Sequence, residues 1–157
     1  MDVDVIVKAS QVAVAVKAIT DKFPQLVSKD LIYNVRFNSQ RGQSRVEPER
    51  IDVIRSNNAF FQEILDRHVV PINAKGTVIF VPTAEAAIAM KFAAAISPNR
   101  GDESRQQDHA DLIALVKAHG NPNFEALAEL GELIYRGGAK ELQDFVAAVR
   151  AGRKAVL

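Results

Sequence analysis

The chain has 157 residues, of which 48% are hydrophobic and 25% charged, a composition typical of one globular domain or of one domain with a helical appendix. Its formal net charge of +1 produces no overall field favouring nucleic acid or a membrane surface, and the lack of cysteine excludes disulfides and thiolate chemistry. No basic segment followed by a long apolar run opens the sequence, and no apolar stretch is long enough to span a bilayer. A cytoplasmic protein with no membrane partner is therefore expected.

The first half of the chain predicts strands with helices between them. Residues 3–7 alternate β-branched residues with a carboxylate, which is typical of a strand, and residues 10–22 carry apolar side chains at helical spacing. Alternation predicts a second strand over 31–37, and the polar residues 38–49 indicate a loop. The elements expected next are a strand, a helix and a pair of strands around a turn, at residues 50–55, 58–65, 69–72 and 77–81.

The second half of the chain predicts helices only. Thr83 is suited to cap a helix that runs to about Ile96, and Glu85 suits the positive end of that helix. Glycine and proline then divide three further helices, which are expected at residues 105–119, 123–135 and 139–150. The predicted fold class is therefore α/β (α+β), with a mixed sheet in residues 1–82 and a helical region, 83–157, packed on it; a single domain is the alternative.

Three carboxylates are the first candidate site. Asp2 and Asp4 are two residues apart on a predicted strand, so their side chains point to the same face, and Asp52 stands alone in another apolar strand. If the two strands are neighbours, the carboxylates converge, and like charges that close require a cation. Hard oxygen ligands suit Mg²⁺ or Mn²⁺, which can hold the oxygens of a phosphoryl-type reaction. The alternative is a solvated strand edge.

A lysine among small residues is the second candidate. Lys91 lies on the same side of its predicted helix as Ile88, and an inward lysine requires an anion. On the next helix Asp108 and Asp111 lie on or beside the apolar stripe. The sequence therefore predicts an ion pair between Lys91 and Asp108 or Asp111, beside a phosphate site. The alternatives are a purely structural ion pair and a lysine whose ammonium group reaches the surface.

Five arginines make the segment 36–55 basic, and they offer a grip for RNA phosphates or a triphosphate tail. A solvated strand face is the other interpretation of this pattern. The arginines are Arg36, Arg41, Arg45, Arg50 and Arg55.

The order of these motifs resembles the nucleotidyltransferase superfamily, in particular small bacterial and archaeal members that include the AbiEii-type toxin group. The resemblance runs from the first residue to about residue 119. The motifs that carry it are Asp2-Val3-Asp4, Arg50-Ile51-Asp52-Val53-Ile54, Ala89-Met90-Lys91-Phe92-Ala93-Ala94 and Arg105-Gln106-Gln107-Asp108-His109-Ala110-Asp111.

The resemblance implies a metal-dependent transfer of a nucleoside monophosphate from a nucleoside triphosphate to a hydroxyl of RNA, a protein or a small molecule. Mg²⁺ or Mn²⁺ would be the cofactor, and Asp52 would also help to activate the acceptor hydroxyl. Lys91 would contact the nucleotide phosphates, with Asp108 and Asp111 pairing the lysine or orienting the acceptor. The implied catalytic and metal-binding residues are Asp2, Asp4 and Asp52.

The sequence departs from the family at its start. Family members place a Gly-Ser turn shortly before the first carboxylate pair, where a helix N-terminus holds the triphosphate. This chain begins at the carboxylates and has no Gly-Ser there, so that, as written, poor transfer or none is expected. The alternative function is a non-catalytic binding or regulatory module that pairs with another protein.

Overall fold

A computed structural model describes residues 2–39, 50–155 and 157, without the side chain of Asp2. The chain divides into two compact units, Met1–Leu65 and Asp66–Leu157. The predicted loop residues 40–49, with Arg41 and Arg45, lie outside the described part. A mixed sheet followed by a helical C-terminal half confirms the predicted fold class. None of the helices in the described ranges is long and apolar enough to cross a membrane.

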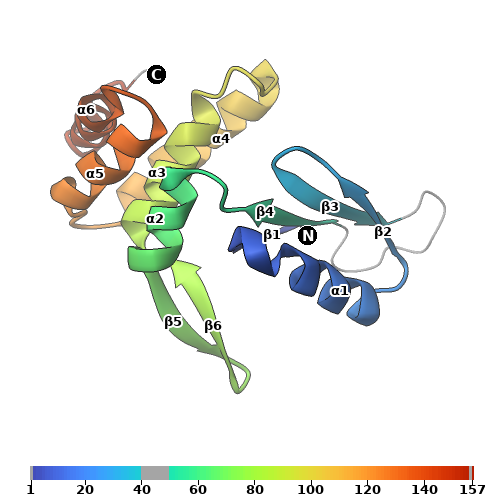
Figure 1. Cartoon of the computed structure of the whole chain (residues 1–157). Helices are drawn as coiled ribbons and strands as arrows, with labels where there is room; N and C mark the ends of the chain where they lie inside the picture. Colours follow the sequence, from blue (N-terminus) through green and yellow to red (C-terminus); the bar gives the residue numbers. More distant parts are fainter. Residues whose placement is uncertain (1, 40–49, 156) are drawn as a thin grey trace. The chain divides into compact units, whose positions relative to one another are not determined.

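The first unit is built on a four-stranded mixed sheet (Figure 1). Its strands have the order β1 (Asp2–Val7), β4 (Arg50–Arg55), β3 (Asn34–Ser39) and β2 (Leu26–Asp30). β1 is parallel to β4, whereas the other neighbouring pairs are antiparallel. The helix α1 (Val12–Lys22), which a 3₁₀ turn (Ala9–Gln11) precedes, lies along one face of this sheet.

Only one face of the sheet enters the core of the first unit. Every second side chain of β3 and β4 is buried there against the apolar stripe of α1, because successive side chains of a strand point to opposite faces. The residues of this core are Leu26, Val35, Phe37, Ile51 and Val53, packed against Val3, Val7, Val12, Ala15, Val16, Ile19 and Phe23. The polar residues of the strands are left on the opposite face.

The predicted strand over 31–37 is wrong in its first part. β3 begins at Asn34, and Ile32 and Tyr33 are exposed in the connection that precedes it. The strand β2 was not predicted, because Leu26 is its only buried residue and a strand buried at one end shows no alternation. The other predicted strands and helices all exist, with ends shifted by a few residues.

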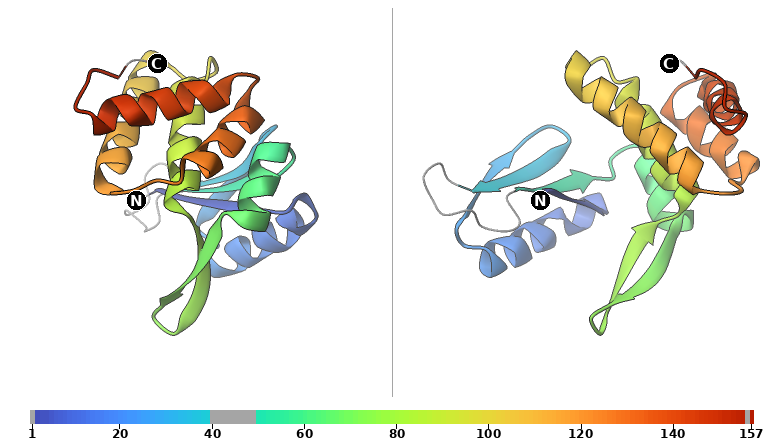
Figure 2. Two further views of the ribbon diagram at one scale, coloured as in Figure 1. Left: turned by 90° about the vertical axis from the view of Figure 1, so that its left-hand side faces the viewer. Right: turned by 180° about the vertical axis from the view of Figure 1, so that it is seen from behind.

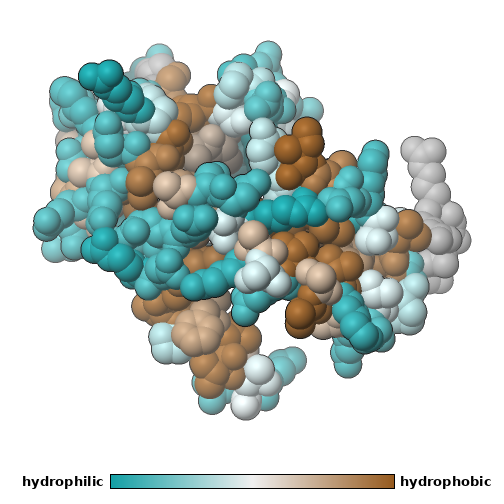
Figure 3. Space-filling model, in the orientation of Figure 1, coloured by the Kyte–Doolittle hydropathy of each residue, from teal (hydrophilic) through white to brown (hydrophobic). Residues whose placement is uncertain are grey.

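The second unit begins with a β-hairpin and continues with four helices. The strands β5 (Val69–Ala74) and β6 (Thr77–Pro82) are antiparallel, and positive φ angles of 51° at Lys75 and 84° at Gly76 form the turn between them. Both faces of the hairpin carry exposed apolar side chains. Figure 3 shows apolar surface on the side of β5 and β6 that is turned to the viewer. The helix α2 (Ala59–Arg67), which precedes the hairpin, spans the division between the units.

The four helices pack around one apolar core, and α5 and α6 lie against each other in both views of Figure 2. They are α3 (Ala84–Ala95), α4 (Asp102–Ala118), α5 (Phe124–Ile134) and α6 (Gly138–Arg150). The predicted cap of α3 is confirmed, because the side chain of Thr83 accepts a hydrogen bond from Ala86 N–H. The largest fully buried side chains of this core are Ile88, Phe92, Leu112, Val116, Leu127, Leu130, Leu142 and Val146.

Candidate functional site

Two of the three predicted carboxylates lie side by side on the polar face of the sheet. Asp4 on β1 and Asp52 on β4 are partners in the parallel register, and neighbouring strands are about 4.8 Å apart. Ile51 and Val53, on either side of Asp52, enter the core, so Asp52 points to the opposite face, and Val3 places Asp4 there in the same way. Asp2 is in register with Arg50, and its side chain lies outside the described part.

The register continues across the sheet and forms a row of four charged residues. Arg36 on β3 is the antiparallel partner of Asp52, and Lys29 on β2 is the partner of Arg36. In the strand order β1-β4-β3-β2 the charged row therefore reads Asp4, Asp52, Arg36 and Lys29, with both anions at one side and both cations at the other. Attraction between the two halves of the row is strongest at its centre, where Asp52 meets Arg36.

Asp52 is the most enclosed member of the charged row, and nitrogen donors surround its carboxylate. Only 8% of its side chain is exposed, against 39% for Arg36. Arg36 donates two hydrogen bonds, from Nε to Oδ1 at 2.8 Å and from Nη2 to Oδ2 at 3.1 Å. Asn34 Nδ2 donates a third to Oδ1 at 2.6 Å, and Arg50 Nε lies 3.5 Å from Oδ2. Two arginines thus supply the positive charge that the neighbouring carboxylates require.

The three described arginines of the basic segment pair with carboxylates. Arg36 and Arg50 turn toward Asp52 on the sheet, while Arg55 donates to the carbonyl oxygen of Leu31 at 2.5 Å and pairs with Asp30. Each described arginine of the segment is therefore held by a carboxylate of this chain. They are not a simple solvated strand face, and an incoming phosphate would have to compete with these ion pairs.

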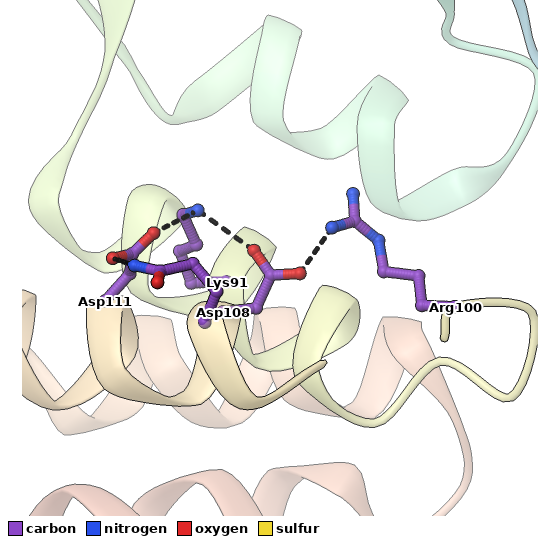
Figure 4. Close-up of polar contacts among 5 residues, drawn as sticks. Lys91, Arg100, Asp108 and Asp111 are labelled. Carbon is purple, nitrogen blue, oxygen red and sulfur yellow. Dashed lines mark hydrogen bonds and ion pairs between the residues drawn. The ribbon is translucent and has the colours of Figure 1, made fainter. Parts of the chain in front are cut away.

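The predicted contact of Lys91 with acidic residues is present in the second unit (Figure 4). Lys91 Nζ on α3 donates to Asp108 Oδ1 at 3.0 Å and to Asp111 Oδ2 at 2.8 Å, both on α4. Arg100, in the connection between the two helices, pairs with the other oxygen of Asp108. Gln107 donates to Asp111 at 2.8 Å. These bonds join α3 to α4 through two carboxylates and two cations.

The charges of this cluster stabilise one another. Burial alone would lower the pKa of Lys91, but its hydrogen bonds to Asp111 and Asp108 outweigh burial and raise the pKa above its ordinary value. The hydrogen bonds from Lys91 and Gln107 hold the pKa of Asp111 below its ordinary value. Lys91 is therefore fully protonated at neutral pH, which suits an electrostatic role and excludes a role as a general base.

The candidate residues fall into two groups, one in each unit. Asp2, Asp4 and Asp52 belong to the first unit, whereas Lys91, Asp108 and Asp111 belong to the second. That both groups serve one site stays a prediction. The sequence did not point to Asn34 or Arg100. The contact of Asn34 with Asp52 depends on the register of β3 on β4. Arg100 lies in a loop, and hydrophobic periodicity does not predict the path of a loop.

A second polar cluster joins the ends of three helices. Glu85, in the first turn of α3, accepts a hydrogen bond from Asn123 N–H at 3.0 Å, and His119 Nε2 lies 3.3 Å from the same carboxylate. Burial alone would raise the pKa of Glu85, but the hydrogen bonds from the backbone N–H groups of Asn123 and Glu85 and from His119 outweigh it, so that the pKa lies below its ordinary value of 4.5. Glu85 therefore stabilises the fold in its ionised form.

We expect Glu85→Gln to lower the free energy of unfolding at pH 7 by about 1–2 kcal/mol, because the hydrogen bonds to a charged carboxylate become weaker bonds to a neutral amide. Since the pKa is depressed in the folded state, this contribution is present above the ordinary pKa and disappears as the pH falls through the folded pKa. Urea unfolding of both proteins between pH 7 and pH 3 measures the difference, which should shrink below about pH 4.5.

The matched control is Glu103→Gln, which removes the same charge from an exposed position in the first turn of α4. Its effect should stay within about 0.5 kcal/mol at every pH. A difference for Glu85→Gln that is the same at pH 7 and pH 3 would contradict the assigned role of the carboxylate.

Comparisons with known proteins add a distant structural similarity. No family model matches the chain, and no curated protein sequence matches it. Among solved structures, the chain is similar to an antigenic nucleotidyltransferase-like protein from Paracoccidioides brasiliensis, with 16% sequence identity and a TM-score of 0.42, over 89% of this chain and 67% of that one. A similarity of this size says nothing about activity, which has to be inferred from the residues of this chain.

Proposed function

We propose that the chain is a protein of the nucleotidyltransferase type, which binds a divalent cation and a nucleoside triphosphate on the polar face of its sheet. The observation that carries the proposal is the pairing of Asp4 with Asp52 in register on neighbouring parallel strands. Two carboxylates at this spacing are ligands suited to Mg²⁺ or Mn²⁺, and Asp2, at the alternate position of β1, is the third proposed ligand.

The proposed reaction is the transfer of a nucleoside monophosphate to a hydroxyl acceptor. The acceptor oxygen forms a bond to the α-phosphorus, the bond from that phosphorus to the bridging oxygen breaks, and pyrophosphate leaves. Asp52 would take the hydroxyl proton, and a cation held by Asp4 and Asp52 would supply stabilisation of the charge on the attacking and leaving oxygens. RNA, a protein or a small molecule is the acceptor class in this proposal.

Lys91, Asp108 and Asp111 have a supporting role in the proposal. Lys91 is the residue assigned to the nucleotide phosphates, and the two carboxylates hold its ammonium group in place. The sequence likeness of this segment to AbiEii-type toxins extends the proposal to a role in a toxin–antitoxin pair, with a partner protein. That extension rests on the likeness of the motifs alone.

Metal binding is the direct test of the proposal. We expect the full chain to bind Mn²⁺ in a calorimetric titration and Asp4→Ala to weaken this binding at least about tenfold, because even residues that only support metal ligands typically contribute 10- to 100-fold. Asp21→Ala is the control, since it removes an equal charge from an exposed residue of α1 that pairs with Lys17. Equal affinities of wild type and Asp4→Ala would remove Asp4 from the metal site.

A non-catalytic module that binds an anion or nucleotide is the second candidate function. The observation in its favour is the hydrogen-bonded ion pair between Arg36 and Asp52, in which a guanidinium group provides the positive charge that a metal ion would provide. The two functions differ in their products. Release of pyrophosphate from nucleoside triphosphate in the presence of Mg²⁺ supports the enzyme, whereas binding of nucleotide without turnover supports the module.

A further inference from the structure

Most acceptor positions of Asp52 are occupied by other groups of the chain. An ionised carboxylate offers about four lone-pair positions. Three of them accept hydrogen bonds from Arg36 and Asn34, and Arg50 Nε lies at ion-pair distance, 3.5 Å from Oδ2. A metal ion at Asp52 therefore competes with these groups, above all with the two hydrogen bonds that Arg36 donates.

Arg36 is the group whose departure changes Asp52 most, because it donates two of the three hydrogen bonds, whereas the equally exposed Arg50 lies 3.5 Å away. Asp52 is fixed in a strand that is paired on both sides and has only 8% of its side chain exposed, whereas 39% of the Arg36 side chain is exposed. A guanidinium group binds phosphate with the same two-pronged geometry with which it binds a carboxylate. Phosphate oxygens that approach the charged row from solvent can therefore draw Arg36 away from Asp52.

The loss of Arg36 changes the charge beside Asp4. Without the Arg36 guanidinium group, Asp52 would keep Asn34 and Arg50 but would lie beside Asp4 with less positive charge around it, an arrangement that favours a cation between the two carboxylates. We propose that Arg36 is a latch on Asp52 that the polyphosphate of a nucleotide opens, so that anion and divalent cation bind with positive cooperativity. This inference rests on the proposed metal site and adds the order in which its ligands become available.

The latch predicts opposite effects of one substitution on two ligands. Arg36→Gln should bind Mn²⁺ about tenfold more tightly than wild type in the absence of nucleotide, because Asp52 loses the two hydrogen bonds of Arg36; coupling between two sites is commonly 5- to 150-fold. The same variant should bind inorganic tripolyphosphate about tenfold more weakly in the presence of EDTA, because the anion has lost its guanidinium partner. If the role of Arg36 were merely structural, Arg36→Gln would weaken the binding of both ligands.

Two variants separate the latch from general charge and from misfolding. Lys29→Gln removes the same charge from the same row at a residue whose side chain is exposed, and its Mn²⁺ affinity should change less than about twofold. Arg36→Lys keeps the charge but loses the two-pronged bond, so its Mn²⁺ affinity should lie between those of wild type and Arg36→Gln. In the double variant Arg36→Gln/Asp52→Asn the gain should disappear.

The outcomes distinguish the latch from the proposed function. The latch is established if Arg36→Gln binds Mn²⁺ more tightly than wild type, if Lys29→Gln does not, and if the added substitution Asp52→Asn removes the increase in affinity. A second outcome is that wild type binds Mn²⁺ through Asp4, while neither Arg36→Gln nor Arg36→Lys binds it more tightly than wild type. In that case the latch is wrong and the metal site stands. If no variant binds Mn²⁺, both are wrong.

Discussion

The double substitution Lys91→Met/Arg100→Met is expected to lower the free energy of unfolding of the second unit by about 3–5 kcal/mol. Asp108 explains the size of this effect: only 6% of its side chain is exposed, and its two oxygens are bound by Lys91 and Arg100, one each. Removal of both cations leaves the buried carboxylate of Asp108 without these partners. A buried charge that loses its ion-pair partners destabilises the folded state strongly.

Each single substitution should have a much smaller effect, because the other cation still neutralises Asp108. Lys91 and Arg100 are more than a third exposed, so solvent screens each contribution, and about 0.5–1.5 kcal/mol is expected for either variant alone. The loss in the double variant should therefore exceed the sum of the single losses, which is the sign of coupled residues in a double-mutant cycle.

Urea unfolding followed by far-UV circular dichroism measures all four proteins. Lys117→Met is the matched control, because Lys117 is an exposed residue of α4, and its effect should stay within about 0.5 kcal/mol. Strictly additive single losses would show that Asp108 does not depend on the two cations together. The cycle tests the structural role of the cluster independently of any nucleotide binding by Lys91.

Local signals were sufficient to predict most elements of the fold. Thr83 at the start of α3 is a capping residue whose side chain accepts the expected backbone hydrogen bond, from Ala86, and Asn58 before α2 accepts one from Phe61 in the same way. The turn at Asn73–Gly76 and the breaks around Gly120 and Gly137 were visible because glycine and asparagine favour turns wherever they occur. Such signals need no knowledge of distant parts of the chain.

The errors concern elements that distant parts of the chain determine. β2 is an edge strand with four exposed residues, and pairing with β3 rather than its own pattern makes it a strand. Ile32 and Tyr33 favour a strand by intrinsic preference, yet they lie in the exposed connection between β2 and β3. Tertiary context overrides propensity at both places.

The site shows the same division. The alternation of residues alone predicted that Asp4 and Asp52 each lie on the polar side of its strand. In the structure the two residues are partners in the register of β1 and β4. The bond from Arg36 to Asp52 could not be predicted, because it requires the register of β3 on β4. That register changes the interpretation of Asp52 from a vacant metal ligand to a carboxylate whose release requires a competitor for Arg36.

Gly131→Ala is expected to destabilise the second unit by about 1–3 kcal/mol, because it overpacks the crossing of α5 and α6. A Cβ atom at Gly131 would lie 2.6 Å from the carbonyl oxygen of Gly138, and one at Gly138 would lie 2.2 Å from the oxygen of Gly131. The atoms in the way belong to the backbone, so no side-chain rotation relieves the clash and the helices must move apart. Thermal unfolding and urea unfolding both measure the loss.

Gly120→Ala provides the control, since a Cβ atom at that position meets no atom within 4 Å. Its effect should be within about 0.5 kcal/mol. The helix preference of alanine over glycine, about 1 kcal/mol, acts in favour of Gly131→Ala, so any net loss underestimates the clash. If Gly131→Ala is as stable as wild type, α5 and α6 cannot approach as closely as the structure has them. The fully buried Leu127 and Leu142, one on each helix, would then lack the close packing that this crossing gives the core.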